Sequence, residues 1–411
     1  MWLAETDQYW VPTHNMMEEV IGDFHLPERV TIYDNTLREG EQTPGVVFRT
    51  EEKVEIAMTM DDLGVGGIEI FAAVSEDDRA ALREIQRRGL KNAKVYSLAR
   101  CKKSDIDKAA ECGVYGVTLE GPSNGWTAEK VLGLKSYDQV VKNFVDAVKY
   151  AHSLGLHTSG GGWDSGRATM AQLEYQYKTL ADAGIDELHY GDTYGFTNPW
   201  TTAYIYRKMR EWVGPDIDLA THFHNDFGLA TANAMGAVIG GATVVHGTMN
   251  GLGERAGNAS IDELAVDLEL LLGVKTGIDF SKLYPASEKI AAIAKNPVNP
   301  NKPITGEREF KTGSGLVLDM WEKVGTTGRG RYACLPFVPE MIGRKGVEIC
   351  IGKGVGASSV RKLCRDRGYE PNQDQVRAIM ARIKEEAHMR KTLIPDYRVD
   401  AIVAEVCGAE Q

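Results

Sequence analysis

The amino-acid sequence predicts an α/β protein, a (β/α)8 TIM barrel followed by a small, mainly helical C-terminal subdomain. Two observations support this prediction. Over residues 30–275, eight short runs rich in β-forming residues alternate with longer stretches of helical periodicity. Beyond residue 273 this alternation stops, and a stretch rich in proline and asparagine leads into a tail of different pattern.

The eight β-rich runs predict parallel strands joined by helical crossovers. They are VTIYD (30–34), GIEIF (67–71), KVYSL (94–98), GVTLE (116–120), LHTSG (156–160), ELHYG (187–191), DLATHFH (218–224) and ATVVHG (242–247). Several stretches between them end in glycine, as helices commonly do, and parallel strands need such crossovers. An open doubly wound sheet is the alternative, but no G-x-G-x-x-G follows the first run. A closed barrel is therefore favoured.

The same pattern divides the chain into four expected parts. An N-terminal extension (1–29) precedes the barrel (30–275). A linker (276–306) contains the stretch KNPVNPNKPITG, and a C-terminal subdomain occupies residues 307–411. That subdomain contains glycine-dotted segments and one clear helix with apolar positions at helical spacing.

Composition and charge exclude several classes of protein. The 411 residues are 43% apolar and 26% charged, which is typical of a globular protein that can bury a large core. The 47 basic and 58 acidic residues give a net charge of −11. Such a balance argues against nucleic acid or anionic lipid as a partner, although it permits a local basic pocket for an anionic substrate.

The sequence also predicts a reduced, cytoplasmic protein. No apolar run approaches the roughly 18–20 residues of a membrane span, and the acidic, aromatic N-terminus does not resemble a signal peptide. The six cysteines are sparse and form no C-x-x-C pair, so buried thiols are expected. They are Cys101, Cys112, Cys334, Cys350, Cys364 and Cys407.

Three strand ends carry polar residues suited to chemistry, because active sites of (β/α)8 barrels lie at the carboxyl ends of the strands. In the first segment two acidic residues flank an arginine in a turn bounded by glycine. These charged residues either belong to an active site or form an ion pair that only stabilises the turn. The third contains glycines that let backbone approach a ligand, with a flexible loop as the alternative. The segments are YDNTLREGEQ (33–42), HFHND (222–226) and NGLGERAGN (250–258).

The second segment predicts a metal site. His222 and His224 lie two residues apart in an extended strand, so both imidazoles point to the same side and can reach one ion. A lone histidine is more often a satisfied core residue. A pair at this position, with carboxylates nearby, suits a catalytic divalent ion with open coordination positions.

Together the three segments resemble the DRE-TIM metallolyases. Within that superfamily they are similar to the Claisen-condensing branch, which comprises 2-isopropylmalate, homocitrate and citramalate synthases. The matching stretches are D-N-T-L-R-E-G-E-Q-T-P-G (34–45), H-F-H-N-D-F-G (222–228) and N-G-L-G-E-R-A-G-N-A-S (250–260). The hydroxymethylglutaryl-CoA lyase branch would carry a cysteine in the third segment, and this chain has none there. The resemblance thus points to a divergent synthase-like member.

The resemblance implies a divalent metal ion (Mn, Mg, Zn or Co) bound by Glu39, His222 and His224. Asn258 would lie beside the ion, as a ligand or next to one. A 2-oxo acid can chelate such an ion through its carboxylate and keto oxygens, and the ion then polarises the carbonyl.

The resemblance also implies residues that act on the substrate. Arg38 would bind the substrate and stabilise the oxygen that becomes negative. Gln42 and Glu69 would complete the catalytic group, Glu69 by orienting the site, and Thr193 would contact the substrate carboxylate. The residues expected to orient the remainder of the site are Asp34 and Glu254.

The tail departs from the family at two histidine motifs. The condensing synthases carry H-x-S-G-I-H, which reaches into the partner chain's site and is tied to deprotonation of the acyl-CoA. Here Thr312 and Val317 occupy the histidine positions, and a further G-K-H-S-G reads G-K-G-V-G (352–356). No histidine occurs between His246 and His388, so an imidazole base from this region is absent.

The predicted pocket departs from the family as well. Homocitrate synthases have a histidine after R-C where this chain has Lys102. Lys102 with Arg100 is expected to bind an anionic group of the substrate, with a solvated strand-end lysine as the alternative. The usual S-x-E-D segment reads S-G-G-G-W-D (159–164), and E-G-P-S-N-G-W (120–126) is also unusual. We expect Trp126 and Trp163, the tryptophans of these two segments, either to line or cover the pocket or to pack against loops at its rim.

We expect a 2-alkylmalate-synthase-like acyltransferase that condenses acetyl-CoA or another acyl-CoA with a 2-oxo acid. The alternative is a metal-dependent lyase or aldolase that acts on a 2-hydroxy or 2-oxo acid without CoA, which the altered loops favour. A regulatory relative that binds the ion without turnover is a third hypothesis, against which the intact arginine, glutamate and histidines argue. The resemblance and the tail predict a homodimer, without an appended leucine-feedback domain.

Overall fold

The computed structural model describes residues 2–325 and 327–408. It separates into two compact units. Unit 1 contains Pro12–Val298, and unit 2 contains Leu3–Val11 together with the residues from Asn299 onward.

Unit 1 is a (β/α)8 barrel, which confirms the predicted fold class. Its strands pair in parallel in chain order, and the last strand pairs with the first, Thr31 opposite Val244, so that the barrel closes. The strands are β1 (Thr31–Asp34), β2 (Gly67–Ile70), β3 (Lys94–Arg100), β4 (Gly116–Glu120), β5 (His157–Gly160), β6 (Glu187–Asp192), β7 (Asp218–Phe223) and β8 (Val244–Gly247). Most strand residues are buried, because helices cover the outer face while side chains fill the interior.

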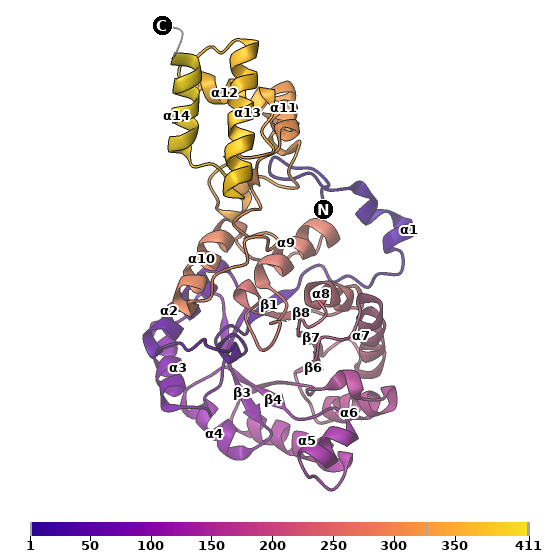
Figure 1. Ribbon diagram of the computed structural model, residues 1–411. Helices are drawn as coiled ribbons and strands as arrows, with labels where there is room; N and C mark the ends of the chain where they lie inside the picture. The colour runs from indigo at the N-terminus through magenta and orange to yellow at the C-terminus, as the bar shows by residue number, and fades with distance from the viewer. Residues whose placement is uncertain (1, 326, 409–411) are drawn as a thin grey trace. The chain divides into compact units, whose positions relative to one another are not determined.

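Helices follow the strands and surround the barrel (Figure 1). Local sequence sets where several of them begin. Thr169 and Gln172 form a capping box at the start of α6, and Asn198 caps α7 with Pro199 in its first turn. The helices are α2 (Thr50–Leu63), α3 (Glu76–Arg88), α4 (Lys103–Glu111), α5 (Tyr137–Ser153), α6 (Met170–Asp182), α7 (Pro199–Val213), α8 (Ala230–Ile239) and α9 (Ile261–Leu272).

The described part of unit 1 also contains the α-helices α1 (Glu18–Ile21) and α10 (Leu283–Ala294). Helix α10 lies within the stretch expected to be a linker. It buries Leu283, Ile290 and other residues of one face, and it contacts α2. The apolar spacing of this segment is helical, so tertiary packing makes it part of the barrel unit.

Unit 2 is mainly helical, as predicted for the tail. Among its described residues, a short parallel pair of strands, β9 (Lys311–Thr312) and β10 (Glu348–Ile349), accompanies four α-helices. The core of the unit includes buried aliphatic residues of the last three helices. The helices are α11 (Gly315–Val324), α12 (Ala357–Arg365), α13 (Gln373–Arg390) and α14 (Asp396–Cys407). All six cysteines have free thiols. In the part of the chain that the structure describes, no helix combines the length and the apolar character needed to cross a bilayer.

Candidate metal centre and active site

Three predicted metal ligands meet at the carboxyl ends of the barrel strands. Glu39 follows β1, while His222 and His224 lie at the end of β7, and one ligand atom from each residue lies within 4.8 Å of the others. His222 Nε2 is 3.5 Å from Glu39 Oε1, and His224 Nε2 is 3.9 Å from Glu39 Oε2. All three side chains are buried. Opposite ends of the barrel sequence thus form one cluster.

Hydrogen bonds between the loops after β1 and β8 position Glu39. The Thr36 hydroxyl donates to the buried Asp34 carboxylate and accepts from the Met249 backbone N–H at 2.8 Å. Thr43 Oγ1 accepts from the Gly253 backbone N–H at 2.8 Å. These bonds hold the turn after β1 against the loop that carries Asn258.

The electrostatics of the cluster favour the forms that bind a metal. Burial lowers the pKa of His222, and it lowers the pKa of His224 to about 4, so both imidazoles are neutral near pH 7. Burial alone would raise the pKa of Glu39, but the Arg38 guanidinium and His222 hold it below its ordinary value. Neutral imidazoles and an ionised carboxylate are the metal-binding states.

Several buried atoms of the cluster fit a cation. Glu39 Oε2, His224 Nδ1 and both side-chain amide atoms of Asn258 have no hydrogen-bond partner among the described residues. Asn258 also pairs with His224 through an isolated antiparallel bridge. Buried polar atoms are normally partnered, and two imidazoles with one carboxylate suit a catalytic divalent ion. The donor set therefore fits the metal that the resemblance implies.

Arg38 is a fixed positive charge beside this cluster. It is 6% exposed, and its guanidinium donates to Glu39 and, at 2.5 Å, to Glu69 Oε2. Glu69 also accepts from Asn35 Nδ2 at 2.5 Å. Burial alone would raise the pKa of Glu69, but the charges of Arg38 and His246 and the hydrogen bond from Arg38 together hold it below its ordinary value. The two carboxylates hold the guanidinium in one orientation.

A cavity of about 230 Å³ opens over these residues. Thr193 is one of its wall residues, and the Thr193 hydroxyl oxygen accepts from the Asp164 backbone N–H at 2.8 Å. The cavity brings most of the predicted site residues together. Its lining comprises Arg38, Glu39, Gln42, Leu98, Glu120, Gly162, Trp163, His189, Gly191, Thr193, His222, His224 and Glu254.

Arg100 and Lys102, predicted to bind the substrate, are not part of this lining. Arg100 instead donates to Asp105 through Nε at 2.7 Å and Nη2 at 3.1 Å, and its side chain is 55% exposed. Lys102 is exposed and precedes the first turn of α4. Asp105 lies in that first turn, where it offers the arginine a bidentate partner outside the cavity.

Two titratable residues of the cavity lining were not predicted as site residues from the sequence, Glu120 and His189. Glu120 ends β4, and His189 lies in the middle of β6. Because alternate residues of a strand share a face, Glu120 follows Thr118 into the barrel, and His189 follows Glu187. This alternation along each strand could have indicated that Glu120 and His189 point into the barrel. It does so only when the residues that face inward are already known from the strand register.

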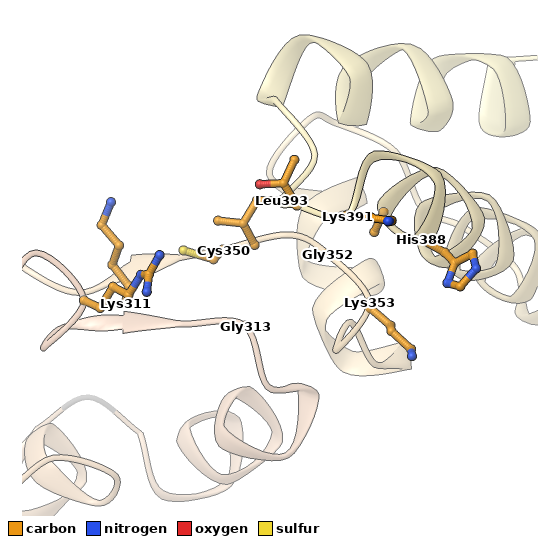
Figure 2. Close-up of a pocket in the computed structure, with 11 residues that line it drawn as sticks. Lys311, Gly313, Cys350, Gly352, Lys353, His388, Lys391 and Leu393 are labelled. Atoms are coloured by element: carbon orange, nitrogen blue, oxygen red, sulfur yellow. The ribbon is translucent and has the colours of Figure 1, made fainter. Parts of the chain in front are cut away.

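The segments that replace the family's histidine motifs are neighbours in unit 2. Thr312 of β9 is paired with Ile349 of β10, and the chain then continues to Gly352 and Lys353. These segments border a hollow of about 700 Å³ with several basic side chains (Figure 2). Its basic lining residues are Arg308, Lys311, Lys353, His388 and Lys391. Figure 2 shows Lys353 and His388 on one side of the hollow and Lys311 on the other.

Comparison with known protein families agrees with this geometry. The family model described as HMGL-like matches residues 29–290, which spans the barrel and every strand-end motif described above. The chain belongs to the HMGL-like family. This match, together with relatives named as condensing synthases, confirms the resemblance drawn from the motifs.

Members of this family with curated names match nearly the full chain. A (R)-citramalate synthase of Methanocaldococcus jannaschii is 37% identical over 380 residues, covering 92% of this chain and 75% of the relative. A 2-isopropylmalate synthase of the same organism is 36% identical over 401 residues, covering 96% and 75%. A homocitrate synthase of Methanothermobacter thermautotrophicus is 35% identical over 378 residues, covering 92% and 93%.

Solved structures support the fold. The HMG-CoA lyase of Bacillus subtilis superimposes with a TM-score of 0.60 at 23% sequence identity, covering 68% of this chain and 98% of the lyase. At that identity the likeness establishes the barrel architecture alone.

Proposed function

We propose that this protein is a divalent-metal-dependent acyltransferase of the 2-alkylmalate synthase type, which joins an acyl-CoA to a 2-oxo acid. The observation that carries the proposal is the convergence of Glu39, His222 and His224 beside the buried Arg38 in one open cavity. The relatives named as citramalate, homocitrate and isopropylmalate synthases support the same reaction class.

Glu39, His222 and His224 would hold the ion, with Asn258 beside them. An ion bound there would supply a Lewis acid that polarises the carbonyl of a chelating 2-oxo acid. The buried, neutral imidazoles and the ionised glutamate provide this donor set without a large rearrangement of charge.

The protein's own groups would stabilise and orient the reactants. Arg38 is the one lysine or arginine in the described cavity lining, so it would donate to the oxygen that becomes negative as the carbon–carbon bond forms. The Thr193 hydroxyl oxygen accepts a hydrogen bond from the Asp164 backbone N–H, so the hydroxyl proton of Thr193 points away from Asp164. Thr193 is therefore suited to donate that proton in a hydrogen bond to the substrate carboxylate. Gln42 lies in the same lining, where its amide can bond the same substrate.

Thiol release from acetyl-CoA tests the proposal. Purified protein is assayed with a panel of 2-oxo acids, once with added Mn²⁺ and once after chelation of metal. We expect release that needs both the metal and a 2-oxo acid. No release, together with pyruvate or glyoxylate formed from 2-hydroxy acids, would instead identify a lyase that works without CoA.

A further inference from the structure

A condensation needs a group that removes a proton from the carbon that becomes the nucleophile. The histidines that the family uses in the tail are absent from this chain. A second family signature with acidic residues, S-x-E-D after β5, is also lost. Counted from Ser159, its two acidic positions fall on Gly161 and Gly162.

The backbone at these two positions leaves no room for an acid. A Cβ on Gly161 would lie 1.9 Å from the His189 carbonyl oxygen. Gly162 has a φ of +109°, and a Cβ there would lie 2.3 Å from Ser123 Oγ. Side chains at both positions are therefore excluded by close packing against neighbouring backbone and Ser123.

Asp164, the next acid along the chain, is engaged elsewhere. It is buried and accepts hydrogen bonds from Asn124 Nδ2 at 2.9 Å and from Thr127 Oγ1 at 2.8 Å. It is also outside the cavity lining. Its carboxylate holds the loop after β4 and is not available in the cavity.

Glu120 places a carboxylate beside Gly161 and Gly162, the positions at which the family has acidic residues. Leu119 of β4 pairs with Gly160 of β5, so the next residues, Glu120 and Gly161, lie side by side at the ends of the two strands. Glu120 shares the face of Thr118, whose side chain lies near Glu69 inside the barrel. The Glu120 side chain lines the cavity and makes no hydrogen bond or ion pair with any described residue.

We propose that Glu120 is the catalytic acid–base of this enzyme; this inference rests on the proposed function. A carboxylate oxygen of Glu120 takes the proton from the carbon next to the thioester carbonyl. The electron pair of that C–H bond forms the new bond to the keto carbon, whose π electrons move to its oxygen. The proton on Glu120 then passes to this alkoxide, and water cleaves the thioester to release CoA, so atoms and charge balance.

The surroundings of Glu120 suit proton exchange near neutral pH. Burial raises the pKa of Glu120 to about 7, Glu69 and Glu39 also raise it, and the charge on Arg38 opposes them. The partly buried Cys101 after β3 is a further titratable group close by, and burial raises the pKa of its thiol, which keeps it protonated near neutral pH. A carboxyl group that titrates near the working pH serves both as base and as acid.

His189 is the competing candidate in the same cavity. Its Nδ1 has no hydrogen-bond partner among the described residues. Burial, together with the charges of His246, His222 and Arg38, holds the pKa of His189 well below its ordinary value. An imidazole that resists protonation is a poor base, so His189 provides the comparison variant.

The full-length protein loaded with Mn²⁺ tests the proposal with Glu120→Gln, Glu120→Asp, His189→Asn and the surface control Glu111→Gln. We expect Glu120→Gln to lower kcat by roughly 10²–10⁴-fold, the range for losing an acid–base group. Its Mn²⁺ affinity and its KM for the 2-oxo acid should change by no more than about threefold. Glu120→Asp should recover part of the rate, and the acidic limb of the pH–rate profile should disappear in Glu120→Gln.

The outcomes separate this inference from the proposed function. If the wild type releases no thiol with any 2-oxo acid, both fail. If the wild type is active and Glu120→Gln keeps its rate within a few-fold, with the acidic limb intact, only the role of Glu120 is overturned. Loss of rate and of the acidic limb in His189→Asn, with Glu120→Gln active, would assign the role to His189.

Discussion

Replacing Arg38 with methionine removes a buried positive charge while it keeps much of the side-chain volume. Arg38 is 6% exposed and lies between the Glu39 and Glu69 carboxylates. Removing one partner of a buried ion pair typically costs about 3–5 kcal/mol of stability. Losing one group that stabilises an oxyanion costs roughly 10²–10³ in rate. We expect both losses in Arg38→Met, because the same guanidinium serves both purposes.

The effect on stability should depend on pH with a defined sign. The pKa of Glu69 is lowered in the folded protein, so its contribution to stability is present above its unfolded value of about 4.3 and is lost as the pH falls through the folded pKa. In Arg38→Met, burial would instead raise the pKa of Glu69. Ionisation of Glu69 would then favour the unfolded state, so the free energy of unfolding would fall as the pH rises. The loss of stability should therefore be larger at pH 7 than at pH 4.

Urea unfolding of the metal-stripped protein at the two pH values measures this difference, and thiol release at pH 7 measures the rate. The matched control is Arg87→Met, since Arg87 pairs with Glu84 on the surface and its side chain is 72% exposed. This control should leave both readouts unchanged within error. A rate within a few-fold of wild type, or an equal loss of stability at both pH values, would refute the role assigned to Arg38.

Three further predictions address the other parts of the site. His224→Ala should weaken Mn²⁺ binding beyond detection at the protein concentrations of calorimetry and should abolish thiol release, whereas the exposed His14→Ala should preserve both. Full activity of the metal-stripped His224→Ala protein would contradict the ligand set. Gly161→Ala should shift the urea midpoint strongly downward because its Cβ would meet the His189 carbonyl oxygen. Gly408→Ala, which meets open space, is its control, and equal midpoints would show that this contact does not exclude a side chain. Arg100→Ala should change the KM for the 2-oxo acid by less than about twofold, because Arg100 pairs with Asp105 outside the cavity lining; a tenfold rise would restore its predicted role.

The barrel could be predicted from the sequence because its strands are short, apolar and bounded by helices with clear ends. Each observed strand lies within about two residues of the expected run, since buried parallel strands read as continuous β-rich segments. Helix α10 was not anticipated, because the prolines and asparagines that follow it obscured its helical spacing. Whether such a segment packs on the barrel depends on its contacts with α2, a helix that lies far from it in the sequence.

The pairing of His222 with His224 could be predicted from their spacing, whereas Glu39 was identified through the family resemblance. The strand ends of a closed barrel meet at the same rim, which brings the three residues together. The walls of the cavity were harder to predict. Arg100 has the same strand-end position as these residues, yet an aspartate five residues later pairs with it. Glu120 reads as part of an unusual loop until the pairing of β4 with β5 shows where its side chain lies.

The proposed centre is a metal ion held by two histidines and one glutamate, and pulsed electron paramagnetic resonance of bound Mn²⁺ tests this ligand set most directly. On protein labelled with ¹⁵N-histidine, we expect nitrogen couplings from two imidazoles in the wild type. One coupling should remain in His222→Gln, with Mn²⁺ still bound at high protein concentration. A wild-type spectrum without histidine couplings, from protein that binds one Mn²⁺, would contradict the proposed centre.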